Sequence, residues 1–207
     1  WKRLKKLLAH AYENVPHYQR QFNKLGITPS DVRDIKDFQK LPFLRKSDIQ
    51  QMPDDFLAVN YDKDKLKKDA TGGSTGQPLI FYRDQICHEW TWKAFERFRN
   101  WIGYSPIDKL ALIWGADRDI PSSYPSNQRW LNSFNYSSDD IEAFIQELIQ
   151  WKPRAIRGYA SSLFLVASYI KQHNLTAPRP VAIESSAEKL WAYQRTVIED
   201  VFNCPVY

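Results

Sequence analysis

Short apolar runs alternate with longer helical patterns through the second half of the chain. The runs lack the polar alternation of half-exposed strands, and the segments between them place apolar residues at helical spacing. Strands are expected at 110–114, 155–157 and 181–185, and helices at about 139–151, 162–173 and 189–202. Strands separated by helices form a mainly parallel sheet, which needs helices on both faces. The sequence therefore predicts an α/β fold.

The first part of the chain predicts a helical lead-in to this sheet. Apolar residues recur at helical spacing over 1–13, and a second short helix is expected over 17–25, with Gly26 as its stop. Prolines further along break the chain into short helical pieces. We expect residues 1–68 to form the lead-in and residues 69–207 to form the α/β portion.

A long aromatic helix and an irregular stretch complete the predicted organisation. Asp84 is expected to cap a helix that reaches about Trp101. Four aromatic residues of this helix recur at helical spacing and are expected in the core: Trp90, Trp92, Phe95 and Phe98. The stretch 115–135 shows no periodicity, and a loop of about twenty residues is usually functional, mobile or both.

Composition excludes several classes of protein. With 43% apolar residues, 207 residues can bury one substantial core, so the chain is not disordered. No apolar run approaches the roughly 20 residues that span a bilayer, and the first residues are too polar for a secretory signal. We therefore expect a cytoplasmic protein without an integral membrane segment. The start at Trp1 suggests that the sequence was cut from a longer one.

Charge and cysteine content argue against nucleic-acid and metal sites. The net charge of +5 and the basic residues between Lys2 and Lys6 would attract polyanions, but basic residues elsewhere are interspersed with acidic ones. No nucleic-acid-binding motif is present, so no nucleic-acid partner is expected. Cys87 and Cys204 lie far apart and the four histidines are scattered, so no metal site is expected. His88 beside Cys87 is interpreted as ordinary surface chemistry.

The loop TGGSTGQP carries the clearest chemical signal in the chain. Its glycines let the backbone turn sharply and present several N–H groups to one anion, and its hydroxyls add further donors. The candidate phosphate-binding residues are Thr71, Gly72, Gly73, Ser74, Thr75, Gly76 and Gln77. The spacings of the Walker loop and of the dinucleotide fingerprint are absent. A flexible turn is the alternative, although Pro78 stiffens the exit of the loop into a strand-like run.

The loop and its flank, TGGSTGQPLIFYRD, resemble the phosphate-binding motif of the adenylate-forming superfamily of acyl-CoA synthetases. The resemblance is greatest to the phenylacetate-CoA ligase branch and its CapK-like relatives, which are linked to capsular polysaccharide biosynthesis. Three more segments are similar to that branch, in the same order. Residues 11–49 carry ENVPxY and LPxxxKxD elements, 152–170 carry GYxS after a strand, and 184–207 end just before an acidic YGxxE-type motif.

This resemblance implies an incomplete amino-terminal domain of a ligase, with the carboxy-terminal domain absent. Such an enzyme uses ATP and Mg²⁺ to convert a small-molecule carboxylate into an acyl-adenylate, and a thiol such as coenzyme A then accepts the acyl group. The loop 71–77 would wrap the β- and γ-phosphates. The nucleotide pocket would be lined by Ser185, Ser186, Ala187 and Glu188. Ligands of open parallel sheets bind outside the strand carboxyl ends, which agrees with this pocket. An equal alternative for Glu188 is a carboxylate that serves the dipole of the following helix.

The remaining candidates follow predicted strands and could line the acid pocket. They are Trp114, Gly115, Tyr159 and Ser161, of which Ser161 could instead cap a helix. Catalytic residues are not assigned, because the expected magnesium-binding motif and catalytic lysine would lie beyond Tyr207. The chain by itself is therefore expected to be inactive. Two alternatives stay open: a CapK-like protein of surface-polysaccharide production without ligase chemistry, and a non-catalytic nucleotide-binding module.

Overall fold

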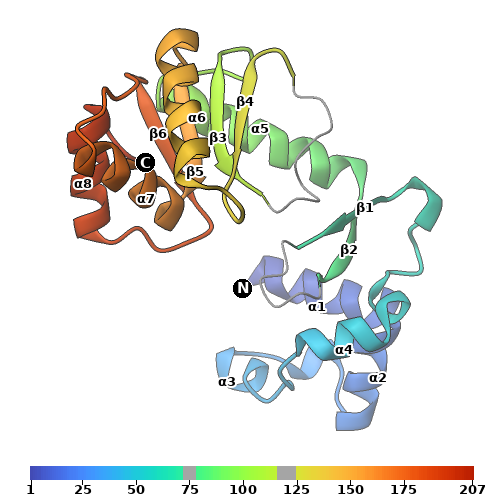
Figure 1. The fold of residues 1–207 in the computed structure, drawn as a ribbon. Coiled ribbons are helices and arrows are strands. Elements are labelled where there is room, and N and C mark those ends of the chain that lie inside the picture. The colour runs from blue at the N-terminus through green and yellow to red at the C-terminus, as the bar shows by residue number, and fades with distance from the viewer. Residues whose placement is uncertain (72–77, 116–124) are drawn as a thin grey trace. The chain divides into compact units, whose positions relative to one another are not determined.

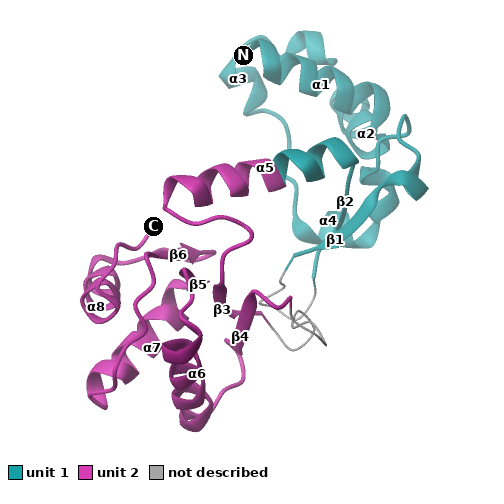
Figure 2. Cartoon of the chain, turned by 90° about the horizontal axis from the view of Figure 1, so that it is seen from above, with its two compact units in different colours: residues 1–91 teal, residues 92–207 magenta. Residues whose placement is uncertain are grey.

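A computed structural model describes residues 1–71, 78–115 and 125–207 (Figure 1). The chain divides into two compact units, residues 1–91 and 92–207, which are described separately here (Figure 2). The division falls inside helix α5, Gln85–Trp101. As predicted, Asp84 caps this helix, because its carboxylate accepts a hydrogen bond from the backbone N–H of Cys87 at 2.6 Å.

Unit 1 is mainly helical, as the sequence predicts. Its helices are α1 Lys2–Asn14, α2 Pro16–Leu25, α3 Ile35–Phe38 and α4 Lys46–Gln51, with 3-10 turns at Pro29–Asp31, Pro53–Phe56 and Lys63–Lys65. Pro16 starts α2 at a position where its missing N–H costs nothing, and Gly26 ends it with a left-handed φ of 64°. Leu8, Phe22 and Val32 form a small core between these elements.

Unit 1 also contains an antiparallel pair of strands. Strand β1, Lys67–Ala70, pairs with β2, Ile80–Arg83, with Ala70 opposite Ile80. The charged segment before the glycine loop is therefore a strand, and the loop is the connection of a hairpin. Strand β1 was not predicted because three of its four residues are charged, and charged residues are uncommon in strands.

Unit 2 is built on a parallel sheet with the strand order β4-β3-β5-β6. The strands are β3 Leu110–Trp114, β4 Gln128–Asn132, β5 Ala155–Tyr159 and β6 Ala182–Ser186. Three of them match the predicted runs. Strand β4 lies in the stretch expected to be irregular, because only Leu131 of its residues is buried. An edge strand of this kind lacks the continuous apolar run of an inner parallel strand.

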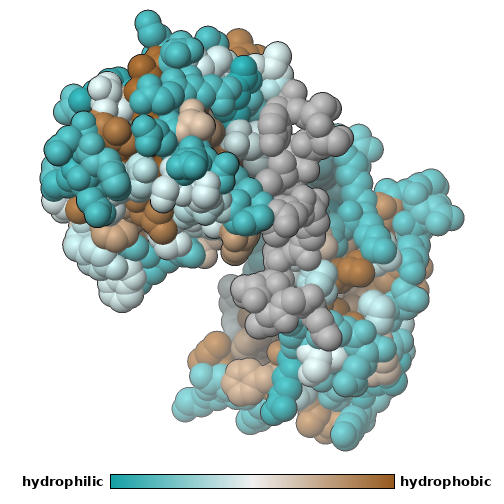
Figure 3. Space-filling view, in the orientation of Figure 1, coloured by the Kyte–Doolittle hydropathy of each residue, from teal (hydrophilic) through white to brown (hydrophobic). Residues whose placement is uncertain are grey.

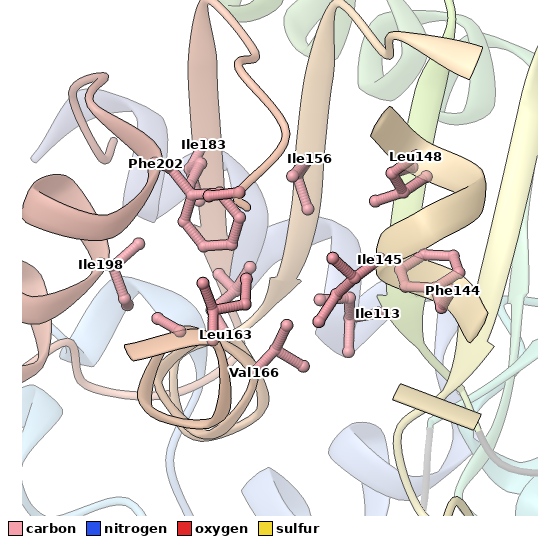
Figure 4. Packing of buried hydrophobic residues seen from close by; sticks show 14 of the residues in the cluster. Ile113, Phe144, Ile145, Leu148, Ile156, Leu163, Val166, Ile183, Ile198 and Phe202 are labelled. Atoms are coloured by element: carbon pink, nitrogen blue, oxygen red, sulfur yellow. The ribbon is translucent and has the colours of Figure 1, made fainter. Parts of the chain in front are cut away.

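Helices cover both faces of this sheet, which confirms the predicted α/β fold. Helices α6 Ser138–Trp151, α7 Ala160–Gln172 and α8 Ala192–Phe202 pack on one face. Figure 4 shows their apolar side chains meeting those of the strands, with Phe202, Leu163 and Ile145 fully buried. On the other face, Phe98 of α5 packs with Leu112 and its neighbours. Burial of each such side chain contributes about 1.5–3 kcal/mol.

The prediction that Trp90, Trp92, Phe95 and Phe98 of α5 all lie in the core is wrong. Phe98 does pack on the core of unit 2, but Trp90 and Trp92 are 73% and 55% exposed. Residues two positions apart point to nearly opposite sides of a helix, so Trp90 and Trp92 cannot share one buried stripe. The periodicity identified a helix but not which side of it is buried.

Gly158 of β5 is required by close packing, and its replacement by alanine is predicted to destabilise unit 2. An added Cβ would lie 2.9 Å from Cγ of Leu163 and 3.0 Å from the carbonyl oxygen of Ile113. Overpacking of this kind costs about 1–3 kcal/mol. Urea unfolding of Gly158→Ala measures the loss. In the Leu163→Ala background the same change should cost less, and an unchanged free energy of unfolding for Gly158→Ala alone would contradict the prediction.

Candidate functional site

The strand order makes the carboxyl ends of β3 and β5 the expected place for a bound ligand. These two strands are neighbours, but the chain leaves β3 toward β4 on one side and leaves β5 toward β6 on the other. In open parallel sheets, ligands bind where the connections diverge in this way, outside the carboxyl ends. Trp114 and Tyr159, both predicted from the sequence, are the last residues of these strands.

Three aromatic side chains form a wall at this edge of the sheet. The rings of Trp114 and Tyr159 are stacked, with centroids 4.2 Å apart and planes 24° apart. Phe134, which follows β4, lies against Tyr159 at 5.9 Å with a 60° tilt and is 67% exposed. We call these three residues the aromatic wall. Such a surface suits a planar ring, which gains from stacking as well as from burial. Phe134 was missed because β4, which positions it, was not recognised.

Gly115 and Ser161 follow Trp114 and Tyr159 in the chain at this edge of the sheet. Gly115 has a φ of 86°, which favours glycine, and its carbonyl accepts a hydrogen bond from the Ser133 hydroxyl at 3.2 Å. Helix α7 already begins at Ala160, so Ser161 lies inside the helix and the alternative of Ser161 as its cap is wrong. The Ser161 side chain is exposed at the carboxyl edge of the sheet.

Glu188 ties the loop after β6 to the start of α7. Its carboxylate accepts a hydrogen bond at 2.8 Å from the backbone N–H of Ser161, in the first turn of α7. A carboxylate is stabilised at a helix N-terminus. The alternative for Glu188 correctly placed its carboxylate at a helix N-terminus, but it named the wrong helix. The partner is α7 and not the following α8. Ala187 takes the left-handed conformation, with a φ of 63°, which turns the chain toward α7.

Ser185 and Ser186 end β6 at the same edge. The backbone N–H of Ser185 donates to the carbonyl of Tyr207 at 2.8 Å. The Ser185 hydroxyl is buried and makes no hydrogen bond within the part of the chain that the structure describes. Buried hydroxyls are nearly always bonded, so this one marks a position where a polar group is expected.

The candidate phosphate loop is described only at its first residue. Gly72, Gly73, Ser74, Thr75, Gly76 and Gln77 lie outside the described residues. The backbone N–H of Thr71 donates to the carbonyl of Leu79, and its Oγ1 accepts from the N–H of Leu79, both at 2.9 Å. The two ends of the loop are therefore held together. Since the Thr71 hydroxyl acts as an acceptor in this bond, its proton can still be donated to an anion.

A buried charged cluster lies on the face of the sheet that carries Trp114. Arg157 of β5 and Glu184 of β6 are paired in register, with Nε and Oε1 3.1 Å apart. Nε of Arg99 lies 3.6 Å from the other carboxylate oxygen, to which the Tyr104 hydroxyl donates. Burial, followed by the hydrogen bond to Glu184, raises the pKa of Tyr104 above its ordinary value. We call Arg99, Tyr104, Arg157 and Glu184 the buried cluster.

Two charged residues in the predicted strands are a sequence signal for this cluster. Arg157 and Glu184 are single charges of opposite sign, and each is preceded in its predicted strand by apolar residues only. Buried charges are almost always paired, so two such charges predict that their strands are neighbours.

The described residues offer little support for a metal site, a reactive cysteine or a membrane-spanning helix. Residues 1–71, 78–115 and 125–207 contain no group of three or more His, Cys, Asp or Glu side chains that could hold a metal ion. Burial raises the pKa of Cys204 to about 11, so its thiol is protonated at neutral pH. Across these same ranges, no helix is both long and apolar enough to cross a membrane.

A cavity of about 520 Å³ lies within unit 1, and none of the predicted site residues lines it. Its lining is largely apolar and includes Leu8, Phe22 and Phe43, of which Phe43 is 97% exposed. Figure 3 shows apolar patches interrupting the polar surface. The lining also includes the polar side chains of His17, Asp48 and Gln51, but none of the residues that the sequence predicts for the site, so the edge of the sheet in unit 2 is the better candidate.

Comparisons with known proteins identify relatives of this chain. No family model matches the chain. It is 24% identical to Protein CapK of Staphylococcus aureus over 99% of this chain and 47% of that protein. It is 35% identical to the phenylacetate-coenzyme A ligase of Pseudomonas putida over 84% of this chain and 40% of that protein. The ligase of Escherichia coli (strain K12) is 36% identical over 55% of the chain and 26% of its own length.

The solved structures show the same fold. An open conformation of 2-hydroxyisobutyryl-CoA ligase, in complex with 2-HIB-AMP and CoA, matches 99% of this chain and 47% of its own, with a TM-score of 0.67 and 18% identity. The chain spans about half or less of the length of these relatives. It is a homologue of CapK and of the phenylacetate-CoA ligases, as the order of its motifs predicts.

Proposed function

We propose that this homologue of CapK and the phenylacetate-CoA ligases is the nucleotide-binding part of a ligase that activates a carboxylic acid with ATP. The carboxylate displaces pyrophosphate from ATP to form an acyl-adenylate, and the thiol of coenzyme A then accepts the acyl group with release of AMP. The observation that carries the proposal is the aromatic wall at the point where the connections after β3 and β5 diverge. A binding surface at this point is what the reaction requires of the fold.

Each predicted segment has a role in this proposal. Residues 71–77 bind the β- and γ-phosphates of ATP through backbone N–H groups and hydroxyls. Residues 185–188 line the nucleotide pocket, where the buried Ser185 hydroxyl fits a polar group of the nucleotide. Gly115, Ser161 and the aromatic wall line the acid pocket. Mg²⁺ would supply neutralisation of phosphate charge. A cytoplasmic location is part of the same proposal.

The aromatic wall further favours an acid that carries a planar ring. Stacked rings such as those of Trp114 and Tyr159 present a flat surface, and aromatic pairs gain about 0.5–1.5 kcal/mol beyond the burial of their area. An aliphatic acid of the same volume would gain the burial but not the stacking. The names of the phenylacetate-CoA ligases agree with an aryl acid.

The test is exchange of labelled pyrophosphate into ATP by the full-length protein with matched acids, because the chain by itself is expected to be inactive. We expect phenylacetate to support exchange with a KM lower than that of cyclohexylacetate by about three- to tenfold, since only the first acid has a planar ring. Octanoate and glycine serve as fatty-acid and amino-acid comparisons. If no acid supports exchange while the folded protein still binds ATP, the ligase proposal is wrong.

A CapK-like role without ligase chemistry is the second candidate. It is favoured by the extent of the CapK match, which covers 99% of the chain against 84% for the ligase of P. putida. In this case the protein takes part in surface-polysaccharide production or serves as a nucleotide-binding module. ATP binding without acid-dependent exchange is the result expected of it.

A further inference from the structure

Planar groups lie in contact from the buried cluster to the exposed edge of the sheet. The guanidinium of Arg157 lies over the ring of Trp114, with its carbon 4.8 Å from the ring centroid, and over Phe95 at 5.5 Å. Trp114 stacks on Tyr159, and Tyr159 contacts Phe134. The Arg157 guanidinium is therefore connected through Trp114 to the other two rings of the aromatic wall.

Glu184 forms an ion pair with the guanidinium that supports this series of contacts, although Nε of Arg157 makes no hydrogen bond among the described residues. The carboxylate lies 3.1 Å from Nε of Arg157, and the two side chains are only 4% and 17% exposed. Their backbones are opposite each other in neighbouring strands, so neither charge can leave without breaking the register of the sheet. Glu184 also precedes the proposed nucleotide pocket on the same strand.

We propose that Arg157 is a positioning residue for the aromatic wall. Held by Glu184, its guanidinium keeps the ring of Trp114 in the plane that stacks on Tyr159, and so prepares the surface that receives the ring of the acid. This inference rests on the proposed acid pocket. It adds a residue that does not itself contact the ligand.

Arg99 provides a matched control inside the same cluster. Its Nε lies 3.6 Å from Glu184 and its side chain is 10% exposed, so it resembles Arg157 in charge and burial. Its guanidinium lies over Phe95 at 5.8 Å and Tyr104 at 5.7 Å, neither of which belongs to the aromatic wall. A purely structural role of the cluster predicts similar effects of substitution at the two arginines, whereas a positioning role predicts different ones.

The first experiment measures the near-ultraviolet circular dichroism of Arg157→Lys and Arg99→Lys, which both keep the charge and lose the planar group. The contribution of Trp114 is the difference between the spectra of the wild type and Trp114→Leu. We expect this contribution to be lost in Arg157→Lys and kept in Arg99→Lys, with native far-ultraviolet spectra in both. Equal spectra of the two lysine variants overturn the proposal. If Arg157→Lys does not fold, Glu184→Gln, which loosens the same guanidinium, should show the same loss.

The second experiment measures steady-state exchange with phenylacetate in the full-length protein. In Arg157→Lys the KM for phenylacetate should rise roughly tenfold while kcat and the KM for ATP stay within about twofold of the wild type, and Arg99→Lys should change none of the three by more than that. Equal KM values for phenylacetate in the two variants contradict the positioning role. If the wild type supports no exchange, the proposed function fails, and the circular dichroism still decides whether Arg157 orders the aromatic wall.

Discussion

Replacement of Gly73 by valine is expected to lower the affinity for ATP on the order of a hundredfold or more, without unfolding the protein. In the proposed phosphate loop the glycines let the backbone direct several N–H groups at one anion, and a β-branched side chain opposes such conformations. Each hydrogen bond to a charged group contributes about 1.5–3 kcal/mol, so the loss of two of them gives an effect of this size. Titration calorimetry with ATP measures the affinity.

Ala70→Val is the matched control for this prediction. It adds the same side chain three residues earlier, at an exposed position of β1 where valine suits the strand. ATP affinity should remain within about twofold of the wild type in this control. If Gly73→Val also binds ATP with unchanged affinity, the loop does not hold the phosphates. Thermal unfolding of both variants separates a loss of binding from a loss of the fold.

Replacement of Glu184 by alanine is expected to reduce the free energy of unfolding by about 3–5 kcal/mol. The carboxylate is 4% exposed and is the anion that both Arg99 and Arg157 face. Its removal leaves two positive charges in the interior of unit 2, each with a desolvation cost that is no longer offset. The Tyr104 hydroxyl also loses its acceptor. Urea unfolding followed by fluorescence and by circular dichroism measures the change.

Glu147→Ala is the control for a surface ion pair in the same unit. Glu147 pairs with Arg129 at 2.5 Å, but its side chain is 48% exposed. An exposed pair contributes only about 0–1 kcal/mol, so this variant should stay close to the wild type. If Glu184→Ala costs no more than Glu147→Ala, the buried cluster does not stabilise the sheet, and the cost assigned to unpaired charges is wrong.

The elements of the fold that could be predicted from the sequence are those whose burial leaves a continuous pattern. Strands β3, β5 and β6 are short apolar runs between helices, and this pattern alone predicted the parallel sheet. Strand β4 escaped because an edge strand buries too little to produce such a run. Strand β5 extends to Tyr159, beyond its predicted end at Arg157, since Gly158 packs against Ile113 and Leu163. That contact depends on tertiary structure, which local periodicity does not contain.

The candidate site was predictable to a smaller extent. Trp114 and Tyr159 were expected to be near a ligand because they end or follow strands, but their stacking depends on β3 and β5 being neighbours although β4 lies between them in sequence. Strand order is not a local property of the chain. For the same reason, the alternative role of Glu188 at a helix start named the wrong helix, since its partner Ser161 lies in an element that precedes it.

The parallel sheet of unit 2 also constrains how the chain folds. Since all its paired strands are parallel, no two of them can be joined by a tight turn, and the pairing of β3 with β5 must enclose both β4 and α6. Each pairing closes a long loop before it gains any contact energy, and topologies of high contact order fold slowly. The pairing of β3 with β5, from which the connections diverge at the candidate site, is therefore expected to be the slowest strand pairing of this sheet to form.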